Sequence, residues 1–195
     1  MKAKTSSRFW AYLIDIILIG ILLTFASKVL IDNEKVILLN RELNELSEKM
    51  LDDGVQSNEN ISEYASLIKK IDLENVMFNV VTIVVILIYF VFIPYYNEGQ
   101  TAGSYFLKIR VIANNGKKLT ITKLMLRNFI LNGLAYLTTC LTFLYLFSDI
   151  VYFVLVAFLS FIQLGLVIVS LFMILYRRDK RGLQDILSET KVVKL

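Results

Sequence analysis

The amino-acid sequence predicts an all-α membrane protein with four transmembrane helices, for three reasons. Of its 195 residues, 56% are hydrophobic, which is well above the fraction in soluble domains. The apolar residues are concentrated in blocks close to the ~20 residues that cross a hydrocarbon core. The segments between these blocks differ sharply in charge. The blocks are at residues 9–29, 76–96, 129–147 and 151–176, with approximate bounds.

The first block is interpreted as a retained helix rather than a signal peptide. Lys2, Lys4 and Arg8 give it a basic start, as in a leader. However, the block is longer than the usual 7–15-residue apolar region of a leader, and no small-residue cleavage motif follows it.

The basic residues predict the orientation. Residues 1–8, 97–127 and 177–195 are rich in Lys and Arg, whereas residues 32–75 carry eleven acidic and five basic residues. Basic segments stay in the cytoplasm. Four crossings therefore predict a multi-pass protein of the cell membrane with both termini cytoplasmic.

Residues 32–75 predict an extracytoplasmic helical hairpin inserted between the first two crossings. Apolar residues recur at helical spacing from Val36 to Met50 and again from Ile61 to Ile71. Asp52-Asp53-Gly54 is expected to break the helix between them. The hairpin is interpreted as a solvated extension, with partner binding as the alternative.

The segment between the second and third blocks, together with the C-terminal tail, predicts a small cytoplasmic β-hairpin layer. Residues 107–111 alternate between apolar and basic, and Asn115-Gly116 is a strong turn signal. We expect the tail run at residues 191–193 to add a third strand, which would bring Asp185 within reach of Arg8 or Arg127.

Two glycines precede this hairpin. Gly99 and Gly103 permit a sharp turn with close backbone approach, and Thr101 lies between them. The loop is interpreted as a structural turn. The alternative is an anion-binding nest, with Lys108 and Arg110 nearby.

Asp15 is the most informative residue, because it interrupts the first apolar block. A carboxylate within the bilayer costs ~2.5–3.5 kcal/mol on translocon scales, so it should face the bundle interior. Arg8 lies two helical turns away and is expected to reach the interface. The predicted partners of Asp15 are Arg127 and Asn132. A polar path could continue along the other blocks through Gln163, Asn79, Ser160 and Ser170. The alternative is that Asp15 only fixes helix packing.

These residues resemble the RDD family of small prokaryotic membrane proteins, named for one Arg and two Asp. Arg8, Ala11 and Asp15 resemble its R-x-x-A-x-x-x-D start. Residues 99–103 are similar to its G-x-T-x-G block, which continues to a late Arg at Arg127. Asp185 resembles the second Asp. The resemblance covers residues 1–31 and 76–195, and Gln184 stands where many members have His. It implies a membrane fold and a transport role without a known substrate.

Two functions remain open. The first is a transporter or transporter subunit for a cation or small solute, with Asp15 as the intramembrane carboxylate. The second is an accessory or regulatory membrane protein that docks a partner through the outer hairpin or the basic cytoplasmic face. An enzyme is not expected, because the sequence holds no nucleophile–base set, cofactor motif or metal motif.

The remaining expectations concern organisation and partners. The chain should form a single membrane domain over residues 1–195. Its expected environment is the lipid bilayer. A homodimer is favoured if the protein is a transporter, because four helices alone form a thin wall around a pathway. Positive-inside topology accounts for the basic charge without nucleic acid.

Overall fold

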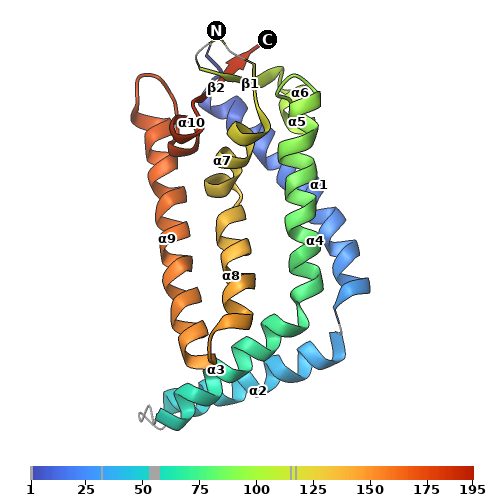
Figure 1. Ribbon diagram of the computed structural model, residues 1–195, viewed down its shortest axis with the longest axis vertical. Helices are drawn as coiled ribbons and strands as arrows, with labels where there is room; N and C mark the ends of the chain where they lie inside the picture. Colours follow the sequence, from blue (N-terminus) through green and yellow to red (C-terminus); the bar gives the residue numbers. More distant parts are fainter. Residues whose placement is uncertain (1, 32, 53–57, 115, 117) are drawn as a thin grey trace.

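The computed structural model describes residues 2–31, 33–52, 58–114, 116 and 118–195. Long helices run side by side, with a small sheet at one end and two helices lying across the other end (Figure 1). We call these the sheet end and the hairpin end. The elements are α1 (Thr5–Leu30), α2 (Asn33–Asp52), α3 (Asn58–Glu74), α4 (Val76–Leu87), the π-helical segment η1 (Ile88–Phe92), α5 (Ile93–Tyr96), α6 (Ala102–Phe106), β1 (Ile109–Ala113), α7 (Ile121–Leu131), α8 (Leu134–Leu146), α9 (Asp149–Tyr176), α10 (Leu183–Leu187) and β2 (Thr190–Lys194).

Three helical stretches in the described residues are long and apolar enough to cross a membrane. They are Thr5–Leu30, Val76–Tyr96 and Asp149–Tyr176. Exposed apolar side chains cover much of these helices, which suits a lipid solvent. Because every backbone polar group must be satisfied internally in lipid, long helices are the expected solution.

The predicted block 129–147 is not one continuous helix. α7 and α8 are bent by 74° at the break between them, and together they would make a fourth span. Gly133 lies in the left-handed region at φ 61°, a conformation that glycine adopts without steric cost and that interrupts the helix.

The segment 32–75 forms the two helices α2 and α3, which pack against each other at the hairpin end (Figure 1). α3 also packs against α9. Leu46 of α2 and both Ala65 and Leu67 of α3 are buried. The predicted break at Asp52-Asp53-Gly54 falls mainly on residues 53–57, outside the described residues.

The sheet joins distant parts of the chain. β1 and β2 are antiparallel, with Val111 opposite Val192, and Lys2 bridges to Val193. The tail strand therefore pairs with the strand of the connecting segment, as predicted, and both ends of the chain meet at the sheet end. The predicted hairpin is wrong, because β1 is followed not by a second strand but by α7. Asn115 of its predicted turn lies outside the described residues. Thr120 accepts a hydrogen bond from Lys123 N and caps α7, so the residues after the turn begin a helix.

Candidate functional site

Asp15 is buried on the inner face of α1. Ala11, Asp15 and Ile19 are the buried residues of this helix, and their spacing of four places them on one stripe. The Asp15 side chain is almost sealed from solvent, with 3% of the residue exposed. The carboxylate therefore depends on protein groups for its hydrogen bonds.

Three neutral groups supply those hydrogen bonds. Tyr89 donates its hydroxyl to Oδ1 at 2.6 Å, and the backbone N–H of Gly103 donates to the same oxygen at 2.7 Å. The Thr101 hydroxyl donates to Oδ2 at 2.6 Å. Both oxygens thus have hydrogen-bond partners. The predicted pairing of Asp15 with Arg127 is wrong, because Arg127 lies on Asp185 instead.

The loop glycines allow this close approach. Gly99 has φ 85°, and a Cβ there would lie 2.0 Å from the carbonyl oxygen of Val111. A Cβ on Gly103 would lie 2.1 Å from the carbonyl oxygen of Ala11 and 2.8 Å from Asp15 Oδ1. Thr101 also caps α6 by accepting from Ser104 N. Gly99 and Gly103 therefore press a short helix against α1 and aim its backbone at Asp15.

A second set of polar contacts lies near Asp15, where two helices depart from α geometry. Tyr12, one turn before Asp15 on α1, donates to Asn132 Oδ1 at 2.9 Å. Asn132, which ends α7, donates to Asn128 Oδ1 at 2.6 Å. Asn128 in turn donates to the carbonyl oxygen of Phe90 at 3.1 Å. The chain of contacts thus connects α1, the break after α7 and the π-helical segment η1.

Gln163 lies at the same break. Its Nε2 donates to the carbonyl oxygen of Ile130 at 2.7 Å, and its side chain lies against Gly133. Among the described residues, neither Gln163 nor Asn132 hydrogen-bonds to Asp15, so the predicted contact between Asp15 and Asn132 is wrong. Both satisfy backbone or amide groups around the interrupted helix, where regular i→i−4 bonds are lost.

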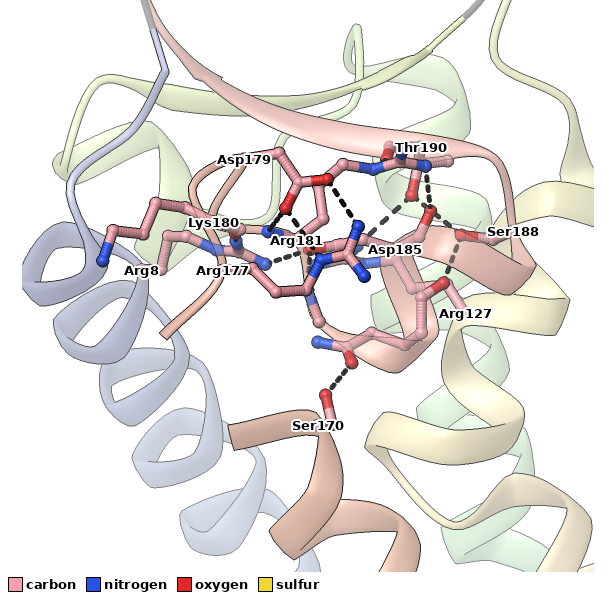
Figure 2. Close-up of polar contacts among 12 residues, drawn as sticks. Arg8, Arg127, Ser170, Arg177, Asp179, Lys180, Arg181, Asp185, Ser188 and Thr190 are labelled. Atoms are coloured by element: carbon pink, nitrogen blue, oxygen red, sulfur yellow. Dashed lines mark hydrogen bonds and ion pairs between the residues drawn. The ribbon is translucent and has the colours of Figure 1, made fainter. Parts of the chain in front are cut away.

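Asp185 forms the second centre, at the sheet end. Arg8 of α1 and Arg127 of α7 each bind one oxygen of its carboxylate, from opposite sides (Figure 2). The Asp185 side chain is fully buried, and those of Arg8 and Arg127 are 10% and 11% exposed. The predicted proximity of Asp185 to both arginines is confirmed.

The surrounding loop holds this triad in place. Gly182 N donates to Asp185 Oδ2 at 3.1 Å. Arg181 donates to the carbonyl oxygens of Asp185 and Thr190, and Arg8 donates to that of Lys180 (Figure 2). Burial alone would raise the pKa of Asp185, but the charges and hydrogen bonds of Arg127 and Arg8 outweigh it, so the pKa lies below its usual value.

Gln184 connects this centre to α9. Its side-chain oxygen accepts a hydrogen bond from Ser170, and its backbone carbonyl accepts one from Ser188 at 2.6 Å (Figure 2). Gln184 is buried, like Ser188 and Thr190 beside it. At the position where the resemblance expects His, the chain therefore holds a hydrogen-bonding residue that does not titrate.

An apolar chamber of about 630 Å³ lies between α1, α7 and α9 and reaches both centres. Asp15, Arg8 and Arg127 line it, together with Arg110 of β1. Most of its remaining wall is apolar. The chamber therefore places the carboxylate of α1 and the arginines of the sheet end on one partly open space, of a size typical of small-molecule sites.

Sequence reasoning missed several contact residues. Tyr12 could have been found, because it lies three residues before Asp15 on the same helical face. Tyr89 and Asn128 could not, because their roles depend on η1 and on contacts between helices. Arg181 lies in a run of basic residues that positive-inside topology already explained.

No curated protein and no solved structure matches the chain. A sequence model of the RDD family matches residues 2–189, nearly the whole chain. The Arg and two Asp that carried the resemblance are Arg8, Asp15 and Asp185, which the structure places in the two centres above. The chain belongs to the RDD family.

Proposed function

We propose that the protein is a membrane transporter, or a transporter subunit, for a cation or small solute, with Asp15 as its intramembrane carboxylate. The observation that carries this proposal is the set of partners around Asp15: a buried carboxylate, on the wall of the chamber, held by neutral donors alone. Ionisable groups inside membrane spans are costly and mark ion or proton pathways. In the part of the chain that the structure describes, no Lys or Arg side chain pairs with this carboxylate, so its oxygens can serve a cation that arrives.

The chemistry of the surrounding groups suits such a cation. The hydroxyls of Tyr89 and Thr101 donate to Asp15 now, but each oxygen also carries lone pairs and can rotate to accept or coordinate. The Ser104 hydroxyl lies 3.0 Å from Thr101 Oγ1. Oxygen atoms of this kind can coordinate hard monovalent cations and can accept protons.

The departures from helical geometry support the same proposal. Transporters bind solutes where membrane helices are interrupted, and π-helical segments are frequent at functional sites. Tyr89 lies in η1 and contacts Asp15 directly. The break at Gly133 is connected to the same helix through Asn132 and Tyr12. Such segments can change their hydrogen bonds without unfolding a whole span.

We propose four crossings with both termini cytoplasmic. The pairing of Lys2 with Val193 at the sheet end supports an even number of crossings, in which α7 and α8 count as one span. To test this, single cysteines at Glu59 and Gly116, in a Cys140→Ser background, are exposed to an impermeant thiol reagent outside intact cells. Only position 59 should react. Equal labelling of both positions would contradict the topology.

The transport proposal is tested in proteoliposomes with a pH-sensitive dye and a panel of monovalent cations. Asp15→Asn should insert and fold yet lose coupled flux. Asp149→Asn is the matched control, because Asp149 pairs with Lys69 at the hairpin end, far along the bundle from Asp15. Flux per folded molecule that is unchanged in Asp15→Asn would overturn the proposal. Four helices make a thin wall for a pathway, so the active form is proposed to be a homodimer.

An accessory or regulatory function is the second candidate. α2 exposes apolar side chains at Ile37 and Leu38 at the hairpin end, beside its acidic residues. Such a face suits a protein partner. Purification from native membranes should then return one stoichiometric partner that Ile37→Glu removes. For the same accessory function, a partner could instead bind the basic face of the sheet end.

A further inference from the structure

The arginines of the sheet end carry more positive charge than their buried partner neutralises. Arg8 and Arg127 share the single carboxylate of Asp185, and all three side chains are buried or nearly so. Arg181 adds a third guanidinium, which hydrogen-bonds to carbonyl oxygens of this loop, and the nearby Asp179 carboxylate pairs with Arg177. A buried charge without a counter-charge is costly, so this centre favours an anion.

The arginines also present donors to the chamber. Arg127 makes its hydrogen bonds to Asp185 and Thr190 through Nη1 alone, which leaves Nε and Nη2 for another acceptor. Arg110, on the same wall, bonds Glu98 through Nη1, while its Nε is the one buried side-chain polar atom without a partner among the described residues. Arginine forks match the geometry of a phosphate or carboxylate.

The rest of the chamber is suited to hydrocarbon rather than to water. Val167, Leu171 and Ile174 of α9 line it, opposite Phe9 of α1. Several residues that line the chamber are also more than half exposed, so they flank its mouth: Phe9, Trp10, Leu171 and Leu175. Both helices are candidate membrane spans, and Trp is favoured at the level of lipid headgroups. We therefore infer that the mouth opens toward lipid, with Trp10 near the level of the headgroups.

We propose that the chamber binds an anionic membrane phospholipid, with its phosphate on the free donors of Arg127 and an acyl chain between α1 and α9. A soluble anion would satisfy the arginines but leave the apolar wall empty. A neutral or zwitterionic lipid would fill the wall but leave the excess charge of the arginines uncompensated. An anionic phospholipid satisfies both. This site goes beyond the transport proposal, because it uses the other centre of the molecule and does not depend on flux.

The experiment measures lipid binding directly. Full-length protein in detergent is titrated with phosphatidylglycerol, phosphatidylcholine or inorganic phosphate, and bound lipid is counted by native mass spectrometry. Phosphatidylglycerol should bind about tenfold more tightly than phosphatidylcholine, because both lipids offer a phosphate to the arginines but the quaternary ammonium of phosphatidylcholine is repelled by their excess positive charge. Arg127→Lys retains the charge but loses the fork, and should weaken the binding of phosphatidylglycerol.

Chamber variants test where the acyl chain lies. Ile174→Trp fills the chamber and should abolish retention of phosphatidylglycerol, whereas Phe172→Trp, on the same helix but outside the chamber, should not. If Ile174→Trp does not fold, Val167→Phe with its control Val169→Phe makes the same comparison.

Three results would overturn the proposal. They are equal binding of the two lipids, retention of phosphatidylglycerol in the chamber variants Ile174→Trp and Val167→Phe, and saturation of the site by inorganic phosphate alone. Lipid binding is measured without flux. A protein that binds phosphatidylglycerol but transports nothing would contradict only the transport proposal. A protein that transports but binds no lipid would contradict only the lipid-binding proposal.

Discussion

Asp15 and Asp185 are both buried aspartates, yet the protein satisfies them in opposite ways. Asp15 receives two hydroxyls and one backbone N–H, all neutral. Asp185 lies between two guanidiniums and beneath a third that holds its loop. Among the described residues, the contacts of Asp15 are therefore neutral groups, whereas the centre at Asp185 holds more arginines than carboxylates.

The difference indicates distinct roles for the two aspartates. A carboxylate between two arginines joins α1, α7 and the tail, and its removal leaves both cations unpaired. A carboxylate with neutral donors can exchange a proton or a cation without breaking an ion pair. We therefore expect substitutions at Asp185 to act on folding and substitutions at Asp15 to act on function.

The largest effect is expected for Asp185→Asn. Breaking a buried ion pair costs about 3–5 kcal/mol, because it leaves an unpaired charge behind. The free energy of unfolding in detergent should fall by that amount. Arg127→Gln added to Asp185→Asn should recover part of the loss. If Asp185→Asn is as stable as the wild type, the triad is not a structural lock.

The pH dependence of stability provides a check on the same residue. The pKa of Asp185 lies below its usual value because, although burial alone would raise it, Arg127 and Arg8 outweigh that effect. Its stabilisation is therefore present above the unfolded pKa of about 4 and lost as pH falls through the lower folded pKa. Asp185→Asn should lack this acid-dependent loss.

An intermediate effect is expected for Gly103→Ala. The new Cβ would overlap the carbonyl oxygen of Ala11 and crowd Asp15 Oδ1, so α6 must move away from α1. Overpacking of this kind costs about 1–3 kcal/mol in unfolding free energy. Gly20→Ala is the matched control, because no atom lies within 4 Å of a Cβ there. Equal melting temperatures for the two variants would show that α6 does not clamp Asp15.

A smaller change in stability is expected for Asp15→Asn. The amide is nearly isosteric and cheaper to bury, but its NH₂ group cannot accept the hydrogen bonds that one carboxylate oxygen receives. The loss should stay below about 2 kcal/mol, less than for Asp185→Asn. Thermal unfolding of both variants in one detergent makes the comparison. A greater loss at Asp15 would reverse the assignment of roles.

The smallest effect concerns a third aspartate, at the hairpin end. Burial raises the pKa of Asp72, and a hydrogen bond from the Tyr152 hydroxyl at 2.7 Å only partly opposes this. The stabilisation from its protonated form is complete below the unfolded pKa of about 4 and lost as pH rises through the higher folded pKa. Asp72→Asn should therefore be slightly more stable than wild type at neutral pH. A destabilised variant would show that the Tyr152 contact needs the carboxylate.

The sequence predicted the features that depend on composition and local spacing. Apolar blocks of membrane length located the spans, since the bilayer requires about 20 apolar residues in each. The residues of the family resemblance led to Arg8, Asp15 and Asp185. The strand alternation around Arg110 predicted β1, and the β-branched run at the end predicted its pairing with the tail.

The structure corrected the features that depend on which distant residues meet. Arg127 was expected on Asp15, because both lie near one end of their spans, but depth along a helix does not fix the direction in which a side chain points. The expected hairpin turn is followed by α7 rather than by a strand, since Thr120 offers a helix cap at that point.

The sequence by itself determined that the chain has helices of membrane length, a buried acidic residue in the first and a basic end that holds the tail. These follow from local periodicity and from the cost of placing charge in lipid. Only the tertiary structure decided that Asp15 is held by neutral donors and Asp185 by arginines. That choice depends on the break at Gly133, the π-helical turn at Tyr89 and the loop before α6, which bring together residues more than seventy positions apart.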